Sequence, residues 1–451
     1  MNIENIEFEM MQGNSHSRCE FLKIYFGWMR HISVEPTMWL YMMAFMVTSV
    51  VEQDFFIYKA CRVNHGLSEE TCVNLKTNKT LNAEVQITVS EFHQWNNIAG
   101  HVVPIILALF FGNWSDRHGR KLPLILGLIG KFIYSFMVII NSLMNTWNLN
   151  MVIYTASLPM GMLGGVALGS YLFTKVLNSS YSIMFTINSV LLAIAIIYSF
   201  LNLKWRTSTQ QRQILGVNPF IDFFDKKHVA ETIKTLIRRR NDHERVYLWI
   251  FLLAMALYTF QRDEKPMSYL YTQLKFKWGV AEFSTFKTFQ SALFVVAMLI
   301  GVPIMSKLLG LRDTVIIAIG ALAHASGRII FALTTIPELF YIGATVAALG
   351  PSVAPVLRSM TSKLVPIEER GKVFAMLSVC DNAVPLFSGI LYSQLYNLTI
   401  NTAPSSIYWL TFSTQIMVLL LISVIHFSSK NENVQEENDE ENNIESELEH
   451  D

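Results

Sequence analysis

The sequence has few charged residues and no net charge. Charged residues make up 16% of the 451 residues, and 35 Lys and Arg residues balance 35 Asp and Glu residues. An average soluble domain has about 25% charged residues. Without a basic surplus there is no support for a nucleic-acid partner. The 52% of hydrophobic residues instead indicates a membrane protein.

The chain also lacks the motifs of metal sites and enzymes. Its four cysteines include no Cys-x-x-Cys pair, and no paired histidine cluster occurs, so we expect no bound metal. No nucleophile elbow, phosphate-binding loop or metal-binding helix is present, so we expect no catalytic residue and no cofactor. No cleavable signal peptide is recognisable, and the first span is expected to direct the chain to the membrane.

What is present is a series of about eleven long apolar segments, each close to the about 20 residues that cross a bilayer. They lie at 37–58, 97–111, 122–140, 151–174, 181–200, 246–262, 283–305, 313–333, 339–360, 371–395 and 405–427. This pattern predicts an all-α membrane protein. Residues 1–34 are expected to be a cytoplasmic N-terminus, 35–200 an N-terminal helix bundle, 201–245 a basic cytoplasmic loop and 246–427 a C-terminal bundle of six helices. The acidic tail, 428–451, is expected to be disordered and cytoplasmic.

The stretch between the second and third segments, residues 112–121, is a compact polar turn with the sequence Gly-Asn-Trp-Ser-Asp-Arg-His-Gly-Arg-Lys. Its basic residues outnumber its one acid, Asp116, which places the turn on the cytoplasmic side of the membrane. The glycines allow neighbouring helices to approach closely, and Asp116 can bind basic groups or the N-terminal end of a helix.

The first outer loop, residues 59–96, carries the sequon Asn78-Lys79-Thr80, which requires an extracellular or lumenal location. Cys61 and Cys72 share this oxidising side and are a disulfide candidate, although either can instead pair elsewhere. Closing so short a loop stabilises the chain by roughly 2 to 3 kcal/mol. Asn178 and Asn397 begin further sequons.

The charge pattern conflicts with a simple crossing of segment 151–174. If every segment crosses once, the loop 201–245 lies outside, yet it is strongly basic and the positive-inside rule assigns it to the cytoplasm. The sequon at Asn178 adds to the conflict, because glycosylation requires 175–180 to lie outside. Two alternatives remain: segment 151–174 re-enters on the side from which it came, or the chain lacks material that a complete transporter has.

Several ionisable residues lie within the predicted spans. Glu52 and Asp54, in the outer part of the first span, are either interface residues or a mouth that attracts cations. Lys131 in the third span either snorkels to the cytoplasmic interface or has a functional partner.

His324 and Arg328 are four residues apart, hence on one face of the ninth span, and Asp381 lies near the middle of the eleventh. Such groups face the bundle interior. A proton carrier needs a group that changes charge in the working pH range, and the unperturbed pKa of a histidine, about 6.5, makes His324 a candidate. The alternative is a structural contact between helices, such as Arg328 with Asp381.

The string Gly-x-x-x-Asp-Arg-x-Gly-Arg-Lys resembles the signature loop between the second and third helices of major facilitator superfamily transporters. Three further strings resemble the proton-coupled folate transporter family, solute carrier family 46, in particular its insect members. They are Glu35-Pro-Thr-Met-Trp-Leu-Tyr41, Tyr269-Leu-Tyr-Thr272 and Arg358-Ser-Met-Thr-Ser-Lys-Leu-Val365. The resemblance implies two pseudo-repeated helix bundles with normally 12 spans, and uptake of folates or related small organic anions. It also implies alternating access, with a proton as the coupling ion.

The resemblance also implies roles for single residues. The loop residues would latch the cytoplasmic gate: Gly112, Asp116, Arg117, Gly119, Arg120 and Lys121. Arg358 matches an arginine that the family uses in substrate and proton binding, or it snorkels to the inner interface. Glu264 lies near an acidic position at the outer end of the seventh helix. The histidine that the family uses for proton coupling in that helix has no clear match.

One part of the family pattern is missing. Residues 154–159 resemble the first half of the fourth helix and 161–171 the second half of the fifth, so the material between them, including a proton-coupling glutamate, is absent. The chain therefore resembles a shortened form with an incomplete N-terminal bundle. The alternative to a transporter is a non-transporting membrane isoform with a regulatory or receptor-like role. Because the tail has no obvious acidic dileucine signal, we expect the plasma membrane rather than the lysosome.

Overall fold

The computed structural model describes residues 34–118, 121–144, 146–153, 181–203, 230, 242–365 and 370–448. Eight helices in these ranges are long and apolar enough to cross a membrane. They cover 35–64, 124–143, 181–202, 280–308, 313–333, 337–363, 372–399 and 406–428. The prediction of an all-α membrane protein is confirmed.

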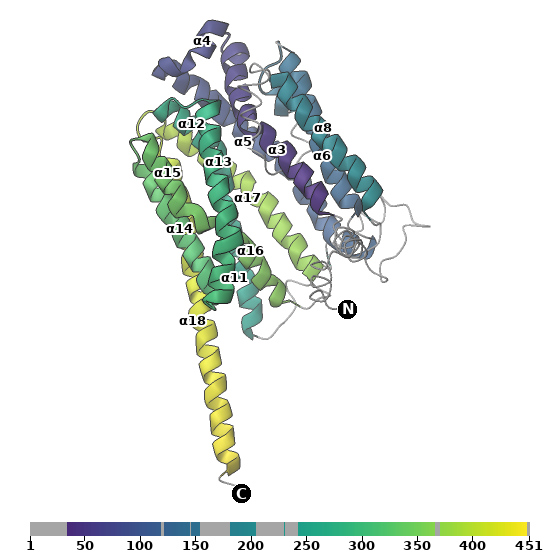
Figure 1. Ribbon diagram of the computed structural model, residues 1–451, viewed down its shortest axis with the longest axis vertical. Coiled ribbons are helices and arrows are strands. Elements are labelled where there is room, and N and C mark those ends of the chain that lie inside the picture. Colours follow the sequence, from purple (N-terminus) through teal and green to yellow (C-terminus); the bar gives the residue numbers. More distant parts are fainter. Residues whose placement is uncertain are drawn as a thin grey trace, which may run out of the picture.

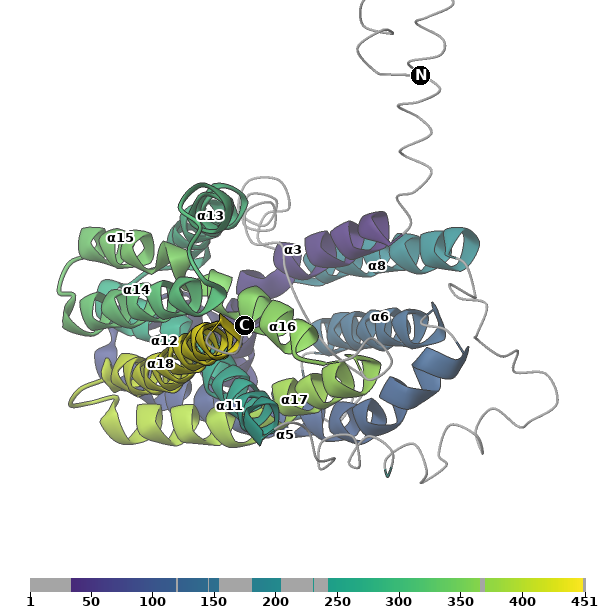
Figure 2. The same ribbon diagram turned by 90° about the horizontal axis from the view of Figure 1, so that it is seen from below.

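The N-terminal bundle lies on one side of the molecule (Figures 1 and 2). Its elements are α3 (Glu35–Lys59), the π-helical turn η1 (Ala60–Asn64), α4 (Glu69–Val73), η2 (Leu75–Thr77), α5 (Lys79–His118), α6 (Lys121–Leu143) and α8 (Tyr181–Asn202). Pro36 occupies the first turn of α3, where its missing N–H is not needed by the helix.

The C-terminal bundle lies on the other side (Figure 2). Its elements are α11 (Asp242–Thr259), η5 (Phe260–Asp263), α12 (Glu264–Phe276), α13 (Val280–Val296), η6 (Ala297–Gly301), η7 (Ile304–Leu308), α14 (Asp313–Leu333), α15 (Pro337–Val346), η8 (Ala347–Ser352), α16 (Val353–Lys363), α17 (Arg370–Thr399) and α18 (Ser406–Leu448). The segments expected as the seventh and tenth crossings are each built from two shorter helices joined by a 3-10 turn, η5 in the seventh and η8 in the tenth.

Helices α6 and α8 run antiparallel, which bears on the conflict over segment 151–174. The hydroxyl groups of Ser142 and Ser182 are 2.7 Å apart, so the end of α6 lies beside the start of α8. At the other end, Lys121 Nζ donates to the carbonyl oxygens of Phe200 and Leu203, both at 2.7 Å. The chain therefore leaves α6 and enters α8 on one side of the membrane. Most of segment 151–174 lies outside the described residues.

Three boundaries differ from the prediction. Residues 79–96, expected as loop, form the outer part of α5, because apolar and small residues on one face pack into the core of the outer half. The seventh crossing does not end at 262 but continues through η5 into α12. Helix α18 continues to Leu448 through the acidic segment expected to be disordered, as an extension of an already formed apolar helix.

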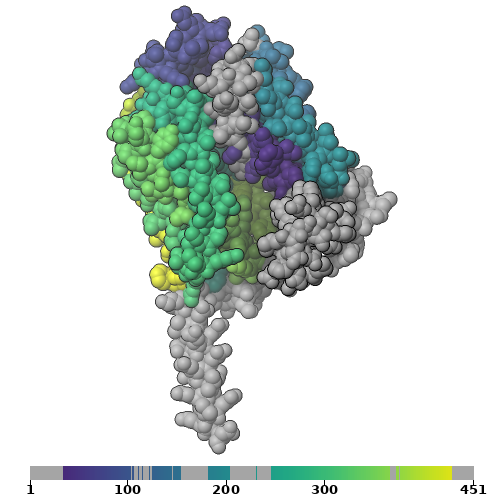
Figure 3. Space-filling view, viewed as in Figure 1, coloured from purple at the N-terminus to yellow at the C-terminus, as the bar shows by residue number. Residues whose placement is uncertain are grey.

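The packing of the two bundles differs between the two ends of the molecule. Towards the end that carries the disulfide, one hydrophobic cluster includes side chains from both bundles, among them Phe56, Phe92, Phe286 and Tyr396. Towards the other end, the second cluster consists only of residues between 248 and 425. Among the residues whose burial is described, the cluster shared by the two bundles is therefore the one in the outer half. Figure 3 shows α3, in purple, beside the green surface of the C-terminal bundle.

Candidate functional site

The centre of the site is the break in the seventh crossing. Four consecutive charged residues, Arg262, Asp263, Glu264 and Lys265, occupy the junction of the 3-10 turn η5 with α12. Asp263 is 6% exposed and Glu264 is 4% exposed. Buried charges inside a membrane bundle need partners, because the free energy of transfer from water is large. Each acid has such partners on other helices.

Glu264 forms a buried ion pair with Arg328 of α14. The distance between Arg328 Nε and Glu264 Oε2 is 2.8 Å. The hydroxyl of Thr411 on α18 donates to the same carboxylate oxygen, and Tyr392 donates to Thr411 at 2.5 Å. The guanidinium also lies over the ring of Phe331, 5.2 Å from its centroid. This network connects α12, α14, α17 and α18.

The predicted contact of Arg328 with Asp381 is therefore wrong. Asp381 instead binds Arg358 of α16, with 2.8 Å between Arg358 Nη2 and Asp381 Oδ2. Thr259 donates to the other oxygen at 2.9 Å, and Arg262 donates to the backbone carbonyl of Asp381 at 3.2 Å. The Arg358 side chain is 46% exposed, so this second pair is open to water. Arg358 points towards α17 rather than snorkelling to the interface.

Asp263 links the two bundles. Asn97 of α5 donates from Nδ2 to Asp263 Oδ1 at 2.9 Å, and Ser388 of α17 donates to Oδ2. Gly389 makes this contact possible, because a Cβ atom at that position would lie 2.5 Å from Asn97 Nδ2. An acid in the C-terminal bundle is thus held by a side chain of the N-terminal bundle.

Two lysines add positive charge to the site. Lys265 and Lys287 both lie within electrostatic reach of Glu264 and Arg328. Lys265 has an exposed side chain beside the buried Glu264. The group has five cations and three acids, a formal charge of +2, and comprises Arg262, Lys265, Lys287, Arg328, Arg358, Asp263, Glu264 and Asp381.

His324 is buried one turn before Arg328 on α14, on the face that the sequence predicts. It packs against the second break in the bundle, the turn η8, where a Cβ at Gly350 would lie 2.6 Å from the imidazole ring. Tyr258 lies beside it, with 6.2 Å between ring centroids, and donates to the Gly350 carbonyl at 3.2 Å. The two broken crossings therefore meet at His324. Discontinuous helices of this kind form binding sites in secondary transporters.

Polar contacts close the outer half of the molecule between the bundles. The pairs are Asp54 with Tyr269, Gln86 with Gln273 and Tyr396, Ser90 with Ser393, Gln94 with Gln394, and Asn97 with Asp263. Asp54 also accepts from Tyr181, so it is neither a free interface residue nor an open mouth. The N-terminal partners of these pairs lie in the outer parts of α3 and α5, and their C-terminal partners lie on the helices that face those parts. The site is closed to the outside, and the exposed Arg358 lies on the opposite side.

The loop predicted as a gate lies where α5 ends at His118 and α6 begins at Lys121. Gly119 and Arg120 lie outside the described residues, as do the side chains of Asp116 and Arg117; Gly112 belongs to α5. Lys121 is buried and binds the last carbonyl groups of α8 within its own bundle. Cations are favourable at that end of a helix.

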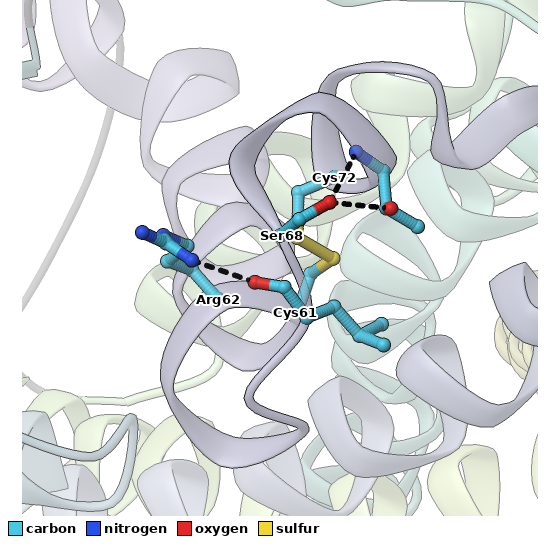
Figure 4. The surroundings of a disulfide bond; sticks show 6 residues. Cys61, Arg62, Ser68 and Cys72 are labelled. Atoms are coloured by element: carbon cyan, nitrogen blue, oxygen red, sulfur yellow. Dashed lines mark hydrogen bonds between the residues drawn. A yellow bond between two sulfur atoms is a disulfide. The ribbon is translucent and has the colours of Figure 1, made fainter.

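The predicted disulfide between Cys61 and Cys72 is confirmed, with Cα atoms 5.8 Å apart. Figure 4 shows it beside Ser68, which caps α4 by accepting from Thr71 N. Of the sequons, Asn78 is exposed and accepts from Leu81 N at the start of α5, whereas Asn397 is half-buried in the last turn of α17. Asn178 lies outside the described residues. Within the described part of the chain, no cluster of three metal-ligating side chains occurs.

The sequence analysis did not assign roles to Asp263, Lys265, Lys287 or Asn97. A signal for the first two was present, because four consecutive charges interrupt a stretch that is otherwise apolar from 246 onwards. Lys287 is an isolated cation within a predicted span, which is a similar signal. The sequence contains no signal for Asn97, because a polar residue is ordinary at the outer end of a span, which is where the sequence places it.

Comparison with known proteins places these observations in a family context. The profile of the Major Facilitator Superfamily matches residues 267–447. The probable peptidoglycan muropeptide transporter of solute carrier family 46 from Drosophila melanogaster is 23% identical over 450 residues, covering 88% of this chain and 86% of the relative. The proton-coupled folate transporter of Bos taurus is 23% identical and covers 70% of this chain and 75% of its own. The lysosomal proton-coupled steroid conjugate and bile acid symporter of Gallus gallus is 23% identical, with 81% and 88% covered.

Solved structures show the same fold. The crystal structure of the human organic anion transporter MFSD10 has a TM-score of 0.60 at 10% identity and covers 87% of this chain and 99% of that chain. A peptide transporter in complex with sulfate has a TM-score of 0.51 at 12% identity and covers 88% and 94%.

Proposed function

Because the chain belongs to the major facilitator superfamily and is similar to solute carrier family 46, we propose that it is a proton-coupled secondary transporter of folates or related small organic anions. As a multi-pass membrane protein of this superfamily, it is a transporter and not an enzyme. The solute and the coupling ion are the parts of the proposal that experiments must establish.

The charge of the site supports an organic anion as the solute. The group around η5 has a formal charge of +2, and Arg358 is its most exposed arginine. A planar guanidinium binds a carboxylate with two parallel hydrogen bonds, so an incoming carboxylate can compete with Asp381 for Arg358. This exposed ion pair is the single observation that carries the proposal.

The closure of the outer half supports alternating access. The bundles share a hydrophobic core and five groups of polar contacts there. These contacts support a state in which the outer side is closed. Transport requires the outer contacts to break, and Asn97 with Asp263 is the contact that reaches the charged site.

Proton coupling has two candidate groups in this site. Protonation of Glu264 would remove its charge and weaken its ion pair with Arg328, which would free a guanidinium for the substrate. His324 lies one turn away, and an imidazole changes charge in the range over which an acidic exterior differs from the cytosol. Both groups contact a broken crossing, so a change in their charge acts directly on the site.

The test is acid-stimulated uptake of labelled folate into cells whose surface expression of the protein has been verified. Arg358→Gln should lower uptake by about 10-fold or more, since a hydrogen bond to a charged group contributes about 1.5 to 3 kcal/mol. Lys363→Gln is the matched control, because Lys363 pairs with Asp313 away from the site. His324→Ala should flatten the pH dependence. Equal losses in both basic variants would argue against a substrate role for Arg358, and an unchanged pH profile would remove His324 from the mechanism.

We also propose that the protein acts at the plasma membrane. Cell-surface biotinylation of the full chain measures this directly, and exclusive recovery from lysosomes would contradict it. Uptake into acidified lysosomes would then replace uptake into cells as the assay.

The alternative function, a non-transporting isoform, is supported by the length of the chain between α6 and α8. The 37 residues 144–180 join helix ends that lie on the same side of the membrane. A returning pair of spans takes about 40 residues before any turn is counted. Normal surface expression without uptake of folate or of a panel of organic anions, together with binding of one of them to the purified protein, would favour this alternative.

A further inference from the structure

A second group of buried ionisable side chains lies in the N-terminal bundle, apart from the site around η5. Glu52 of α3 is 8% exposed, and the hydroxyl of Tyr134 on α6 donates to its Oε1 atom. Lys131 lies one turn before Tyr134 and is 4% exposed. Of the two expectations for Lys131, snorkelling to the cytoplasmic interface is therefore wrong.

Lys131 is held by aromatic rings rather than by a direct ion pair. Its Nζ atom lies 4.2 Å from the ring centroid of Tyr134 and 5.4 Å from that of Phe45. Phe45 and Glu52 are seven residues apart on α3 and share one face, so both helices contribute to the pocket of the lysine. Glu52 is within electrostatic reach of Lys131. These two described residues do not form a direct ion pair like that between Arg328 and Glu264.

This arrangement accommodates Glu52 both with and without a proton. A phenol hydroxyl can donate to a carboxylate and can accept from a carboxylic acid, so the hydrogen bond with Tyr134 survives either way. The ammonium of Lys131 balances the charge of an ionised Glu52. When Glu52 is neutral, the faces of Tyr134 and Phe45 still stabilise the lysine through cation–π attraction. Glu264 differs, because protonation there disrupts a direct hydrogen-bonded pair.

We propose that Glu52, Tyr134 and Lys131 form a proton-binding site in the N-terminal bundle, with Glu52 as the group that takes up and releases the proton. Tyr134 and Lys131 are positioning residues. The site lies about 10 Å, or two helical turns, inside the contact of Lys59 with the carbonyl groups of Asn141 and Met144 at the outer end of α6.

The other ionisable groups on the elements around Glu52 have different partners. On α3, Asp54 accepts from Tyr181 of α8 and Tyr269 of α12, and Lys59 binds the end of α6. His93 of α5 packs against Phe56. Lys287 of α13 donates to Gln290. Tyr134 donates to Glu52, and Lys131 lies within electrostatic reach of it.

The test measures protonation directly and does not require transport. The purified full chain in lipid nanodiscs is titrated between about pH 5 and about pH 8, and infrared difference spectra report the C=O stretch of protonated carboxyl groups. Glu52→Gln, which keeps the shape and the acceptor for Tyr134, should remove one carboxyl band from the wild-type difference spectrum. Glu91→Gln is the matched control, because Glu91 is exposed on the outer part of α5. That control should keep every band of the buried acids.

Two further variants test the positioning roles. Tyr134→Phe removes the hydrogen bond and should shift the frequency of the Glu52 band, which a purely structural role of Tyr134 would leave in place. Lys131→Met removes the neighbouring cation, so the band should persist to higher pH. If Glu52→Gln gives the same difference spectrum as the wild type, the proposal is overturned. It is also overturned if neither Tyr134→Phe nor Lys131→Met shifts the band assigned to Glu52. If the bands behave as expected while the protein takes up no anion, the proposed function fails and this proton site stands.

Discussion

The contact between Asn97 and Asp263 provides the sharpest test of how the two bundles close. Asn97→Ala removes the side chain by which the N-terminal bundle binds this acid, and leaves Asp263 with Ser388 of its own bundle. A hydrogen bond to a charged group contributes about 1.5 to 3 kcal/mol. Because the contact exists only when the outer side is closed, its loss should raise the population open to the outside by roughly 10-fold to 150-fold relative to the closed one.

A cysteine at Ser393 reports this population. Ser393 is fully buried between the bundles, where it contacts Ser90, so a membrane-impermeant maleimide can reach it only after the outer side opens. Labelling of Ser393→Cys from outside intact cells should accelerate by that factor when Asn97→Ala is added. The chain without the introduced cysteine gives the background. Asn202→Ala serves as the matched control, since Asn202 donates to the carbonyl of Tyr198 in its own helix.

Gly389→Ala approaches the same contact from the opposite side. Its Cβ atom would lie 2.5 Å from Asn97 Nδ2 and would displace that side chain, so labelling should again accelerate. If both variants label at the rate of the Ser393→Cys parent, the contact does not hold the outer side closed and the reasoning is refuted. Acceleration by Asn202→Ala as well would show that the assay reports general loosening.

Three other predictions concern stability and topology. Glu264→Gln or Arg328→Met alone should lower the free energy of unfolding by about 3 to 5 kcal/mol, because each leaves a buried partner unpaired. The double variant should lose less than the sum of the two single losses. Thermal unfolding in detergent measures this, and additive losses would contradict it. Replacing Cys61 and Cys72 with serine should destabilise the outer loop by about 3 kcal/mol, and a reducing agent should then have no further effect on the variant. Asn78→Gln should remove one glycan, seen as faster migration on a gel; unchanged migration would mean that this exposed sequon is not used.

The crossings of the C-terminal half could be predicted from the sequence, because each is a long apolar run between polar turns. The run 313–333 coincides with α14, and the expected 339–360 and 405–427 differ from the observed spans by a few residues. The Cys61 to Cys72 bridge was predictable because both cysteines lie in one short outer loop. Such features are local, so the sequence around them is sufficient.

The partners of the buried charges could not be predicted, because they depend on the relative positions of distant helices. Arg328 pairs with Glu264 and not with Asp381, which pairs with Arg358 instead. Sequence separation does not predict these choices, because Asn97 and Asp263 are in contact although they are much further apart in the chain than Arg328 and Asp381. The continuation of the seventh crossing beyond 262 was missed for a related reason. Charges usually mark the end of a span, and here they are tolerated inside it because other helices supply their counterions.

The length of α5 gives the molecule a mechanical lever. Its 40 residues correspond to about 60 Å, roughly twice the thickness of the hydrocarbon core, and its outer end joins the disulfide-bonded loop. If α5 tilts rigidly about its middle by about 10°, its outer end moves by roughly 5 Å while Asn97 near its centre barely shifts. An antibody fragment that binds the outer end of α5 together with the neighbouring loop 400–405 would therefore act on the bundles with a large moment arm, and could arrest them without entering the site.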